Sequence, residues 1–420
     1  MSRKHKDWLK AYLNYTTYSE SPEIFHFWTG VSAIGSCLKR RVWIDQRYFE
    51  WTPNFYIIFV APAGVATKST TISVANTLLK EVEGVNFGPD SGTWQALGKS
   101  LMESRELIAL DPSNIDGAME EMSCITCTPG ELGTFMDFQD RKLVDVLTSL
   151  WDGQRSTFEH RTSTQGVIMI ANPWVNIISG TTPSWLKANM PEAAIGGGFA
   201  SRVIWVFGNK KRQLVAYPGL HGEEAQFEKL KNELIHDLND IANMIGEMIL
   251  TPEAVAWGEQ WYQKHWDTRP VHMASERFDG YIARKQTHIH KLAIVLSAAQ
   301  SSSKIVNEEH LKAAEAITTG MEMDMINVFE SIGVAPTSRL MSELISFLHT
   351  YEKQGLAVSQ QALYRHCFQI MSQQEFDEIT TSAIKAGYIE LKQGPDGLVY
   401  YRLKVKPEDI GKSTLVKSVA

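Results

Sequence analysis

One short segment, residues 59–71, constrains the fold more than any other part of the chain. It reads Phe-Val-Ala-Pro-Ala-Gly-Val-Ala-Thr-Lys-Ser-Thr-Thr, which is an apolar run, a glycine turn and a polar run that opens a helical pattern. The apolar run begins upstream at Asn54 and is rich in aromatic and β-branched residues, which is typical of a fully buried strand. Backbone N–H groups at such a turn and at a helix N-terminus attract anions. The order strand, glycine turn, Lys-Ser, helix therefore predicts a phosphate-binding loop.

Six residues of this segment are the candidates for holding a nucleotide: Pro62, Gly64, Thr67, Lys68, Ser69 and Thr70. We expect Lys68 to reach the β- and γ-phosphates of ATP and the Ser69 hydroxyl to bind Mg²⁺. The segment departs from the usual G-x-x-x-x-G-K-[ST] pattern, because Ala61 and Thr67 replace its two glycines and the loop is one residue longer. The alternative is a strand, turn and helix in which the Lys-Ser pair arises by chance.

The composition indicates an ordinary soluble globular protein. The chain has 420 residues, of which 44% are hydrophobic and 21% charged, and its length predicts two or three domains. No apolar run is long enough to span a bilayer, and the N-terminus lacks a signal-peptide core, so we expect no membrane partner. Cys124 and Cys127 have C-x-x-C spacing but no second matching pair, so a zinc site is not expected. The net charge of −7 argues against a broad nucleic-acid-binding surface but permits a local basic pore.

The hydrophobic patterning predicts an α/β protein with a P-loop NTPase core and several smaller parts. The expected parts are a helical N-terminal segment (1–50), the ATPase core (51–210), a helical domain (211–335), a winged-helix domain (336–406) and a tail (407–420). The core alternates apolar strands with helices, the mark of a layered α/β structure, and a hairpin is expected at 157–171. A polar break at 301–303 interrupts the helical domain.

The winged-helix prediction depends on the order of elements near the C-terminus. Helical patterns cover residues 339–352, 359–368 and 372–387, and a β-hairpin of 388–392 and 398–403 follows them. Three helices followed by a hairpin is the order of a winged helix, a relative of the helix-turn-helix.

Nucleotide hydrolysis also needs a group that orients water and a cation for the developing charge. Glu131 follows an apolar strand about sixty residues after Lys68, so it is the candidate to orient water and to hold Mg²⁺ together with Ser69. Gly130 stands where an aspartate usually precedes this glutamate. The alternative is a solvated carboxylate that caps a helix.

Two further candidates follow the next strands. Thr181 ends an apolar strand, where a polar side chain could sense the γ-phosphate; the alternative is that Thr181 and Thr182 form a simple turn. Arg202 stands between the glycine run 196–198 and an apolar strand, and is the candidate arginine finger toward a neighbouring subunit's nucleotide. The alternative for Arg202 is a surface arginine that caps the strand, and Arg284 is a second candidate for the finger.

Several segments together resemble a known family. They are residues 21–28, 38–45, 51–56, 62–71, 87–90, 92–97 and 130–135, with Ser201-Arg202. In this order they resemble P-loop proteins of phages and prophages known as DNA helicases or primase-helicases, over roughly residues 7–325. The order acidic motif, helix, hairpin and sensor strand is also similar to AAA+ helicases such as the minichromosome-maintenance and superfamily III viral helicases.

The resemblance implies a ring-forming enzyme. In those helicases the hairpin points into the pore of a hexamer and grips single-stranded DNA, so by analogy Arg155, His160 and Arg161 are pore candidates here. For the winged helix, Lys392 and Arg402 are candidate DNA contacts, with binding of a protein partner as the alternative. No primase signature is present in this chain.

The sequence therefore predicts an ATP-dependent DNA helicase or replication ATPase of phage type, in the cytoplasm of a bacterial host cell. It would use ATP and Mg²⁺, form a homo-oligomeric ring, act on single-stranded or forked DNA, and have a primase or replication initiator as its candidate protein partner. One alternative is an ATPase that does not unwind DNA, such as a loader, a packaging motor or a defence ATPase. The other is a non-hydrolysing scaffold that binds DNA or proteins. The sequence shows no base-reading pocket, so the preferred nucleotide is left open.

Overall fold

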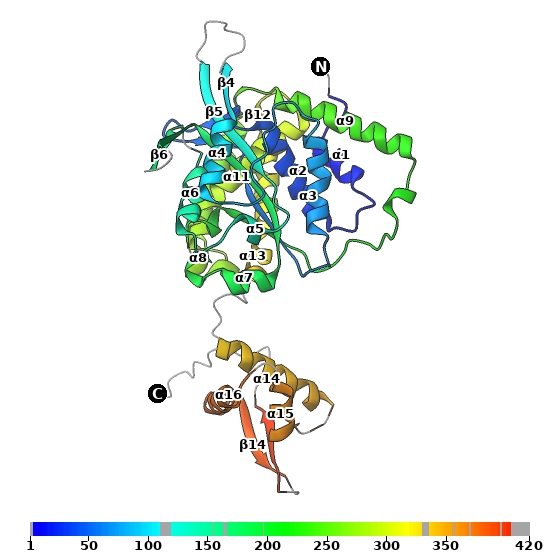
Figure 1. Cartoon of the computed structure of the whole chain (residues 1–420), viewed down its shortest axis with the longest axis vertical. Helices are drawn as coiled ribbons and strands as arrows, with labels where there is room; N and C mark the ends of the chain where they lie inside the picture. The colour runs from blue at the N-terminus through cyan, green and yellow to red at the C-terminus, as the bar shows by residue number, and fades with distance from the viewer. Residues whose placement is uncertain are drawn as a thin grey trace. The chain divides into compact units, whose positions relative to one another are not determined.

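Figure 1 shows the computed structural model of the chain, which forms two compact units, Met1–Ile332 and Gly333–Ala420. The structure describes residues 3–109, 119–153, 155–162, 166–195, 197–329, 336–354, 356, 358–368, 371–394 and 397–404. The expected boundary between residues 335 and 336 lies close to the division between the units. The expected tail, 407–420, lies outside the described residues.

A five-stranded sheet organises the first unit, in the order β4-β5-β8-β3-β9. Its strands are β4 (Arg105–Ala109), β5 (Met119–Cys127), β8 (Pro173–Thr181), β3 (Tyr56–Val60) and β9 (Val203–Phe207). The strands β5, β8, β3 and β9 are parallel, and β4 pairs with β5 in the antiparallel sense. The predicted α/β class is therefore confirmed at the level of a mixed α/β protein with a mixed sheet.

Strand β3 is buried on both faces, as its continuous apolar sequence predicts. Tyr56, Ile58 and Val60 face one hydrophobic core, whereas Ile57 and Phe59 face the other. This alternation follows from the two-residue period of a strand. The sheet is thus the middle layer between two helical layers.

The helices divide between these two cores. One core contains residues of α1 (Trp8–Tyr15), α2 (Glu23–Leu38), α3 (Lys68–Leu79), α9 (Glu224–Ala242), α10 (Pro252–Asp267), α11 (Asp279–Gln300) and α12 (Glu308–Gly320). The other contains residues of α4 (Trp94–Glu103), α5 (Leu132–Phe135), α6 (Arg141–Trp151), α7 (Pro183–Asn189), α8 (Glu192–Ile195) and α13 (Glu322–Phe329), with the start of α11. In Figure 1, α1, α2 and α3 lie together beside α9. The core that contains Ile57 and Phe59 includes residues of all three segments expected at 1–50, 51–210 and 211–335. The structure therefore does not separate these segments as domains.

Smaller sheets complete the first unit. They are β1 (Val42–Asp45) with β2 (Glu50–Trp51) and β10 (Gly246–Glu247), β11 (Ile249–Leu250) with β12 (Ile305–Val306), and β6 (Thr157–Thr162) with β7 (Gly166–Ala171). The β6–β7 pair confirms the hairpin predicted at 157–171. The polar break at 301–303 is also confirmed, because α11 ends at Gln300.

The second unit consists of three helices and a small sheet. Its elements are α14 (Pro336–Lys353), β13 (Val358–Ser359), α15 (Gln360–Cys367), α16 (Gln373–Lys385), β14 (Ile389–Gln393) and β15 (Val399–Leu403), and the sheet order is β13-β15-β14. Ser359 and Ser372 are the N-caps of α15 and α16, which explains where these helices begin. The three helices and the hairpin are confirmed, and β13 is an additional strand that the sequence analysis did not predict.

Two features of the structure concern the membrane span and the zinc site that the sequence does not predict. Among the described helices none combines the length and apolar character that crossing a membrane requires. Cys124 and Cys127 lie on β5 three residues apart, so their side chains belong to different hydrophobic clusters. Burial raises the pKa of the Cys124 thiol to about 12, which leaves it protonated and a poor metal ligand.

Candidate functional site

The phosphate-loop segment lies at the carboxyl edge of the sheet, where β3 and β8 are neighbours. After β3 the chain enters α3, which packs in the core that contains Ile57 and Phe59, whereas after β8 it enters α7, which packs in the core that contains Tyr56 and Ile58. Ligands of open α/β sheets bind at such an edge, where neighbouring connections run in opposite directions. Ala61 N donates to Thr181 O across this point, at 3.2 Å.

Lys68 begins α3 and folds back across the loop. The residue is 7% exposed, and its Nζ donates to Ala61 O at 3.0 Å. Burial lowers the pKa of the Lys68 ammonium, and the nearby Glu131 carboxylate acts in the opposite direction. Among the described residues, the hydrogen-bond acceptor of this ammonium is a neutral carbonyl, and a phosphate oxygen would be a stronger acceptor.

Thr67 stands where the usual pattern of a phosphate loop has a glycine. Its backbone is left-handed, with φ +42° and ψ +44°. Glycine adopts this region without steric cost, whereas a β-branched residue is strained there. The hydroxyl of the buried Ser21 lies 2.5 Å from both Thr67 Oγ1 and Thr71 Oγ1, and donates to Ala66 O at 3.2 Å. Ser21 thus fastens the loop in the conformation that a glycine would otherwise adopt. In the sequence alone, Ser21 is one residue of the segment 21–28 that carries the family resemblance and has no predicted contact with the loop.

Glu131 follows β5 and stands at the N-cap position of α5. Its side chain is exposed and makes no capping hydrogen bond, so the helix-cap interpretation lacks its usual contact. Gly180 brings the segments together, because a Cβ there would lie 3.1 Å from Lys68 Cβ and 3.2 Å from Gly130 O. The lysine and the glutamate therefore approach each other across a glycine of β8.

Ser69 lines a cavity of about 480 Å³ beside the loop. The other lining residues are Ile72, Ser73, Asn76, Lys80, Phe87, Gly88, Asp90, Thr128 and Gly130. Asn76 Nδ2 donates to Thr128 Oγ1 at 2.9 Å and ties α3 to the end of β5. Hydroxyl and carboxylate oxygens are ligands that suit Mg²⁺, directly or through its waters. The donor set of this cavity therefore fits a hydrated magnesium ion.

Asp90 lines this cavity but has no role in the sequence-based prediction, where it is only part of the segment 87–90. Phe87 forms a parallel bridge with Thr126, and Gly88 N donates to Thr126 O at 2.8 Å, so this segment follows β5 to the same edge. Asp90 then supplies an exposed carboxylate where the acidic motif has Gly130 in place of an aspartate. Only the pairing with β5 reveals this position, because Asp90 precedes Glu131 by about forty residues.

The two threonines at the end of β8 have different surroundings. Thr181 is buried and pairs in register with Val60, directly before the loop. Thr182 caps α7, because its Oγ1 accepts a hydrogen bond from Trp185 N at 3.1 Å. Thr182 therefore has the local capping role of a turn residue. Thr181 lies next to the phosphate-loop segment, where the sequence predicts it.

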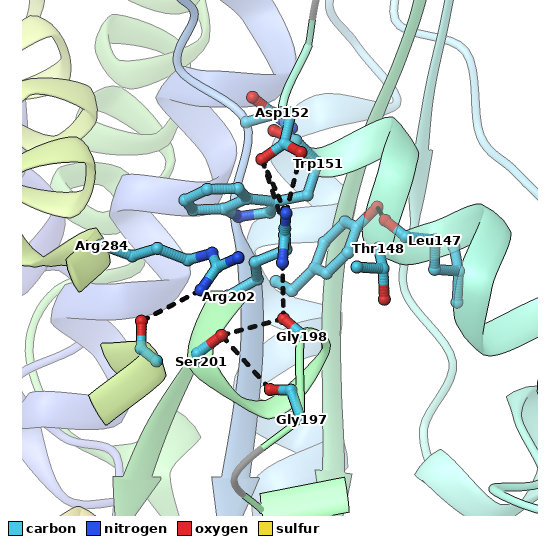
Figure 2. Close-up of polar contacts among 12 residues, drawn as sticks. Leu147, Thr148, Trp151, Asp152, Gly197, Gly198, Ser201, Arg202 and Arg284 are labelled. Atoms are coloured by element: carbon cyan, nitrogen blue, oxygen red, sulfur yellow. Dashed lines mark hydrogen bonds and ion pairs between the residues drawn. The ribbon is translucent and has the colours of Figure 1, made fainter. Parts of the chain in front are cut away.

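Arg202 lies at the other edge of the sheet. It directly precedes β9, which is parallel to β3, so it is at the amino edge whereas Lys68 is at the carboxyl edge. Figure 2 shows its guanidinium held by Asp152, with Nη2 at 2.8 and 3.1 Å from the two carboxylate oxygens, and by Gly198 O at 2.8 Å. Arg202 therefore cannot reach its own chain's phosphate loop.

Arg284 lies beside this pair. Its side chain extends toward Arg202 in Figure 2 and donates to Gly280 O at 3.1 Å. Burial lowers the pKa of Arg284, and the charge of Arg202 lowers it further. Two guanidinium groups thus share the neighbourhood of the Asp152 carboxylate, which makes the position favourable for an additional anion.

The candidate DNA contacts are held within their own units. Arg155 Nε lies 2.6 Å from Glu50, and its guanidinium stacks 4.8 Å from the ring centre of Trp43. On the C-terminal hairpin, the Lys392 and Arg402 side chains are exposed and each faces a carboxylate, at 3.3 and 3.5 Å. His160 and Arg161 lie on β6, and their side chains are outside the described part of the structure.

Comparisons with known proteins leave the site to be interpreted from its own chemistry. A scan of the chain against models of protein families gives no match. A search of curated proteins likewise finds no match.

Proposed function

We propose that the first unit is a P-loop ATPase with an AAA+-like core, and that it binds and hydrolyses ATP at the edge between β3 and β8. The observation that carries the proposal is the buried Lys68 at the start of α3, which meets the acidic turn after β5 across Gly180. A fixed cation and an adjacent carboxylate at the carboxyl edge of a parallel sheet suit the phosphates and the attacking water of a hydrolysis reaction.

Each residue of the site has a role in this proposal. Backbone N–H groups of the loop and the start of α3 bind phosphate oxygens, and Lys68 stabilises the charge that develops on the γ-phosphate. Ser69 and Asp90 hold Mg²⁺, directly or through water, and the ion supplies charge neutralisation to the phosphates when it is bound. Glu131 orients the attacking water, and Thr181 contacts the γ-phosphate from the end of β8.

Arg202 acts on the nucleotide of a neighbouring subunit in this proposal. Arg202 lies at the amino edge of the sheet and Lys68 at its carboxyl edge, so a role in catalysis requires a second copy. Such head-to-tail contacts close into a ring when the rotation between copies permits it, and a hexameric ring is our proposal. The Asp152 pair would hold the guanidinium in place until a neighbour's phosphates compete for it.

We place the enzyme among ATP-dependent DNA helicases or replication ATPases of phage type. The β6–β7 hairpin, which carries His160 and Arg161, would grip single-stranded DNA in the ring, and Arg155 at its base would support it. The second unit has the element order of a winged helix, and Lys392 and Arg402 lie on its hairpin. Its carboxylate neighbours also suit a protein partner such as a primase or replication initiator.

A non-hydrolysing scaffold is the second candidate function. The strained Thr67 in place of glycine and the missing aspartate before Glu131 favour it. A third alternative is an ATPase that moves on DNA, or loads other proteins onto it, without separating strands.

ATP hydrolysis by the purified protein, with and without single-stranded DNA, tests the proposal. We expect turnover that DNA stimulates and that Lys68→Ala reduces at least a hundredfold, whereas Lys99→Ala, at an exposed lysine of α4, leaves it unchanged. Equal turnover in the Lys68→Ala and wild-type proteins would refute the site. An intact oligomer that binds DNA but hydrolyses nothing would support the scaffold, and stimulated turnover without strand separation would support the third alternative.

A further inference from the structure

A second cavity, of about 770 Å³, lies on the other side of α3 from Ser69. The helical period separates the two cavities: Ser69 and Ser73 line the first, and Thr70 and Val74 line the second. Thr67 of the phosphate loop also lines the second cavity. A nucleotide whose phosphates occupy the loop therefore has a cavity of nucleoside size directly beside them.

A well-fastened loop forms one wall of this second cavity. After β9 the chain folds back along the segment that joins α1 and α2, where Lys211 Nζ lies 2.5 Å from Glu20 Oε2. Arg212 Nη2 lies 2.9 Å from a carboxylate oxygen of Glu23, and Gln213 Nε2 donates to Thr17 O at 2.6 Å. These contacts pre-form the wall, so a ligand does not have to order it.

Two stacked ring pairs line the cavity. The rings of Tyr15 and Phe227 have centroids 4.6 Å apart, and those of Tyr18 and His221 have centroids 5.3 Å apart. Tyr18 is 45% exposed, so part of its surface remains free to contact a ligand. Flat aromatic surfaces of this kind stack on nucleic-acid bases whatever their sequence.

His26 of α2 gives the cavity a polar group that has no partner. The side chain is fully buried, and neither ring nitrogen has a hydrogen-bond partner among the described residues. Burial lowers the pKa of His26 to about 4, with a smaller contribution from Arg212, so the imidazole is neutral and offers one donor and one acceptor. Leaving both unused costs folding free energy, and a ligand with a donor and an acceptor would satisfy them.

We propose that this cavity binds the purine base and the ribose of the nucleotide held by the loop. Tyr18 stacks on the base, and His26 contacts its polar edge. A purine is favoured over a pyrimidine because its larger ring system buries more surface in a cavity of this volume. The inference deepens the proposed function and rests on it, since the loop must hold the phosphates.

Calorimetric titration of the full-length protein tests the inference, with ATP, GTP, CTP, UTP and inorganic tripolyphosphate as the probes. We expect the purine nucleotides to bind at least tenfold more tightly than the pyrimidine nucleotides and tripolyphosphate. Tyr18→Ala should weaken purine nucleotide binding about tenfold and leave tripolyphosphate binding unchanged. Tyr48→Ala, at a tyrosine that is 95% exposed on the β1–β2 turn, is the matched control.

A second variant, His26→Phe, separates a binding role from a packing role. Phenylalanine keeps a ring of similar size and removes the two unpartnered nitrogens, so thermal unfolding should occur at a higher temperature than in the wild type. The same variant should bind purine nucleotides several-fold more weakly. A protein that is more stable but unchanged in nucleotide affinity would show that His26 does not contact the base.

The outcomes for the cavity and for the loop are distinguishable. Equal affinity for ATP and tripolyphosphate, with Lys68→Ala weakening both, would overturn the base pocket and leave the phosphate loop intact. No effect of Lys68→Ala on either probe would overturn the proposed function itself. Stronger binding of the pyrimidine nucleotides would contradict the purine assignment.

Discussion

The hydroxyl oxygens of Ser21 and Thr67 lie 2.5 Å apart, although the two residues are 46 positions apart in the chain. This contact joins the start of α2 to the phosphate loop at its most strained residue. The strain and the hydrogen bond act in opposite directions, because a left-handed backbone costs a residue other than glycine about 1–2 kcal/mol and a hydrogen bond returns about 1 kcal/mol.

Variants of Thr67 should reveal this balance. Thr67→Val keeps the shape and the strain but removes the hydroxyl, so we expect it to lower the free energy of unfolding by about 1–2 kcal/mol. Thr67→Gly removes the strain and the hydrogen bond together and should remain within about 1 kcal/mol of the wild type. Urea denaturation measures both variants. If glycine proves as damaging as valine, the left-handed conformation of residue 67 is not a source of strain.

The ion pair of Arg202 and Asp152 leads to a second prediction. Arg202 is buried, whereas the Asp152 side chain is 41% exposed, so solvent screens part of the interaction. We expect Asp152→Asn to lower the free energy of unfolding by about 1–2 kcal/mol, less than for a fully buried pair. Glu103→Gln, in the exposed pair with Lys99, should change it by less than about 0.5 kcal/mol.

The same pair tests the proposed finger. Asp152→Asn removes the ion pair but keeps the Arg202 guanidinium in the protein, so DNA-stimulated hydrolysis should persist. Arg202→Ala removes the guanidinium itself and should abolish this hydrolysis. In mixtures of Arg202→Ala and Lys68→Ala subunits, activity should partly return, because each variant supplies what the other lacks across an interface. Mixtures that stay inactive, from subunits that do assemble, would contradict a role for Arg202 in a neighbouring subunit.

Local patterns account for most of what could be predicted from the sequence. The hairpin predicted at 157–171 has its two strands at Thr157–Thr162 and Gly166–Ala171, and the polar break predicted at 301–303 directly follows the end of α11. The strand β4 was missed, because it begins with the charged residues Arg105 and Glu106 and only Ile108 among its residues is buried. The two-residue strands β10, β11 and β12 form by pairing with segments that are distant in the chain, so no local sequence pattern predicts them.

The candidate site divides in the same way. Lys68, Ser69 and Glu131 lie in the turns and helix starts that come after apolar strands, so their positions can be predicted from the sequence. Ser21 and His26 belong to the site only because α2 packs against α3, a contact between elements that are far apart in the chain. Tertiary packing, rather than a motif, recruits such residues.

The buried histidines predict a pH dependence of stability. The pKa of His26, His288 and His290 is lowered to about 4 in each case, mainly by burial. Below pH 6.5 the unfolded chain therefore binds protons that the native state does not bind until about pH 4. Stability should fall as the pH decreases through this window, and each histidine can contribute about 2–3 kcal/mol.

His26→Phe isolates one of these contributions. At pH 7 the variant should already exceed the wild type in free energy of unfolding, because an unpartnered buried imidazole is removed. The difference should widen between pH 7 and pH 5, since the variant has one protonation site fewer in the unfolded state. Urea denaturation at the two pH values measures it. A difference that stays constant would show that His26 titrates normally in the folded protein.

Asp90 leads to the last prediction, which concerns the metal. Its carboxylate and the Ser69 hydroxyl line one cavity, and no aspartate precedes Glu131, so Asp90 is the acidic group best placed to act in its stead. Asp90→Asn keeps the shape of the side chain and removes its charge. We expect Mn²⁺, bound together with a non-hydrolysable ATP analogue and followed by electron paramagnetic resonance, to bind about tenfold more weakly in this variant.

The affinity for the analogue without metal should not fall, because the lost charge is repulsive toward phosphate. Glu103→Gln, at an exposed acid on α4, controls for the change in net charge. Unchanged Mn²⁺ affinity would place the metal on Ser69 and Glu131 alone, whereas weaker binding of the analogue without metal would show that Asp90 shapes the loop.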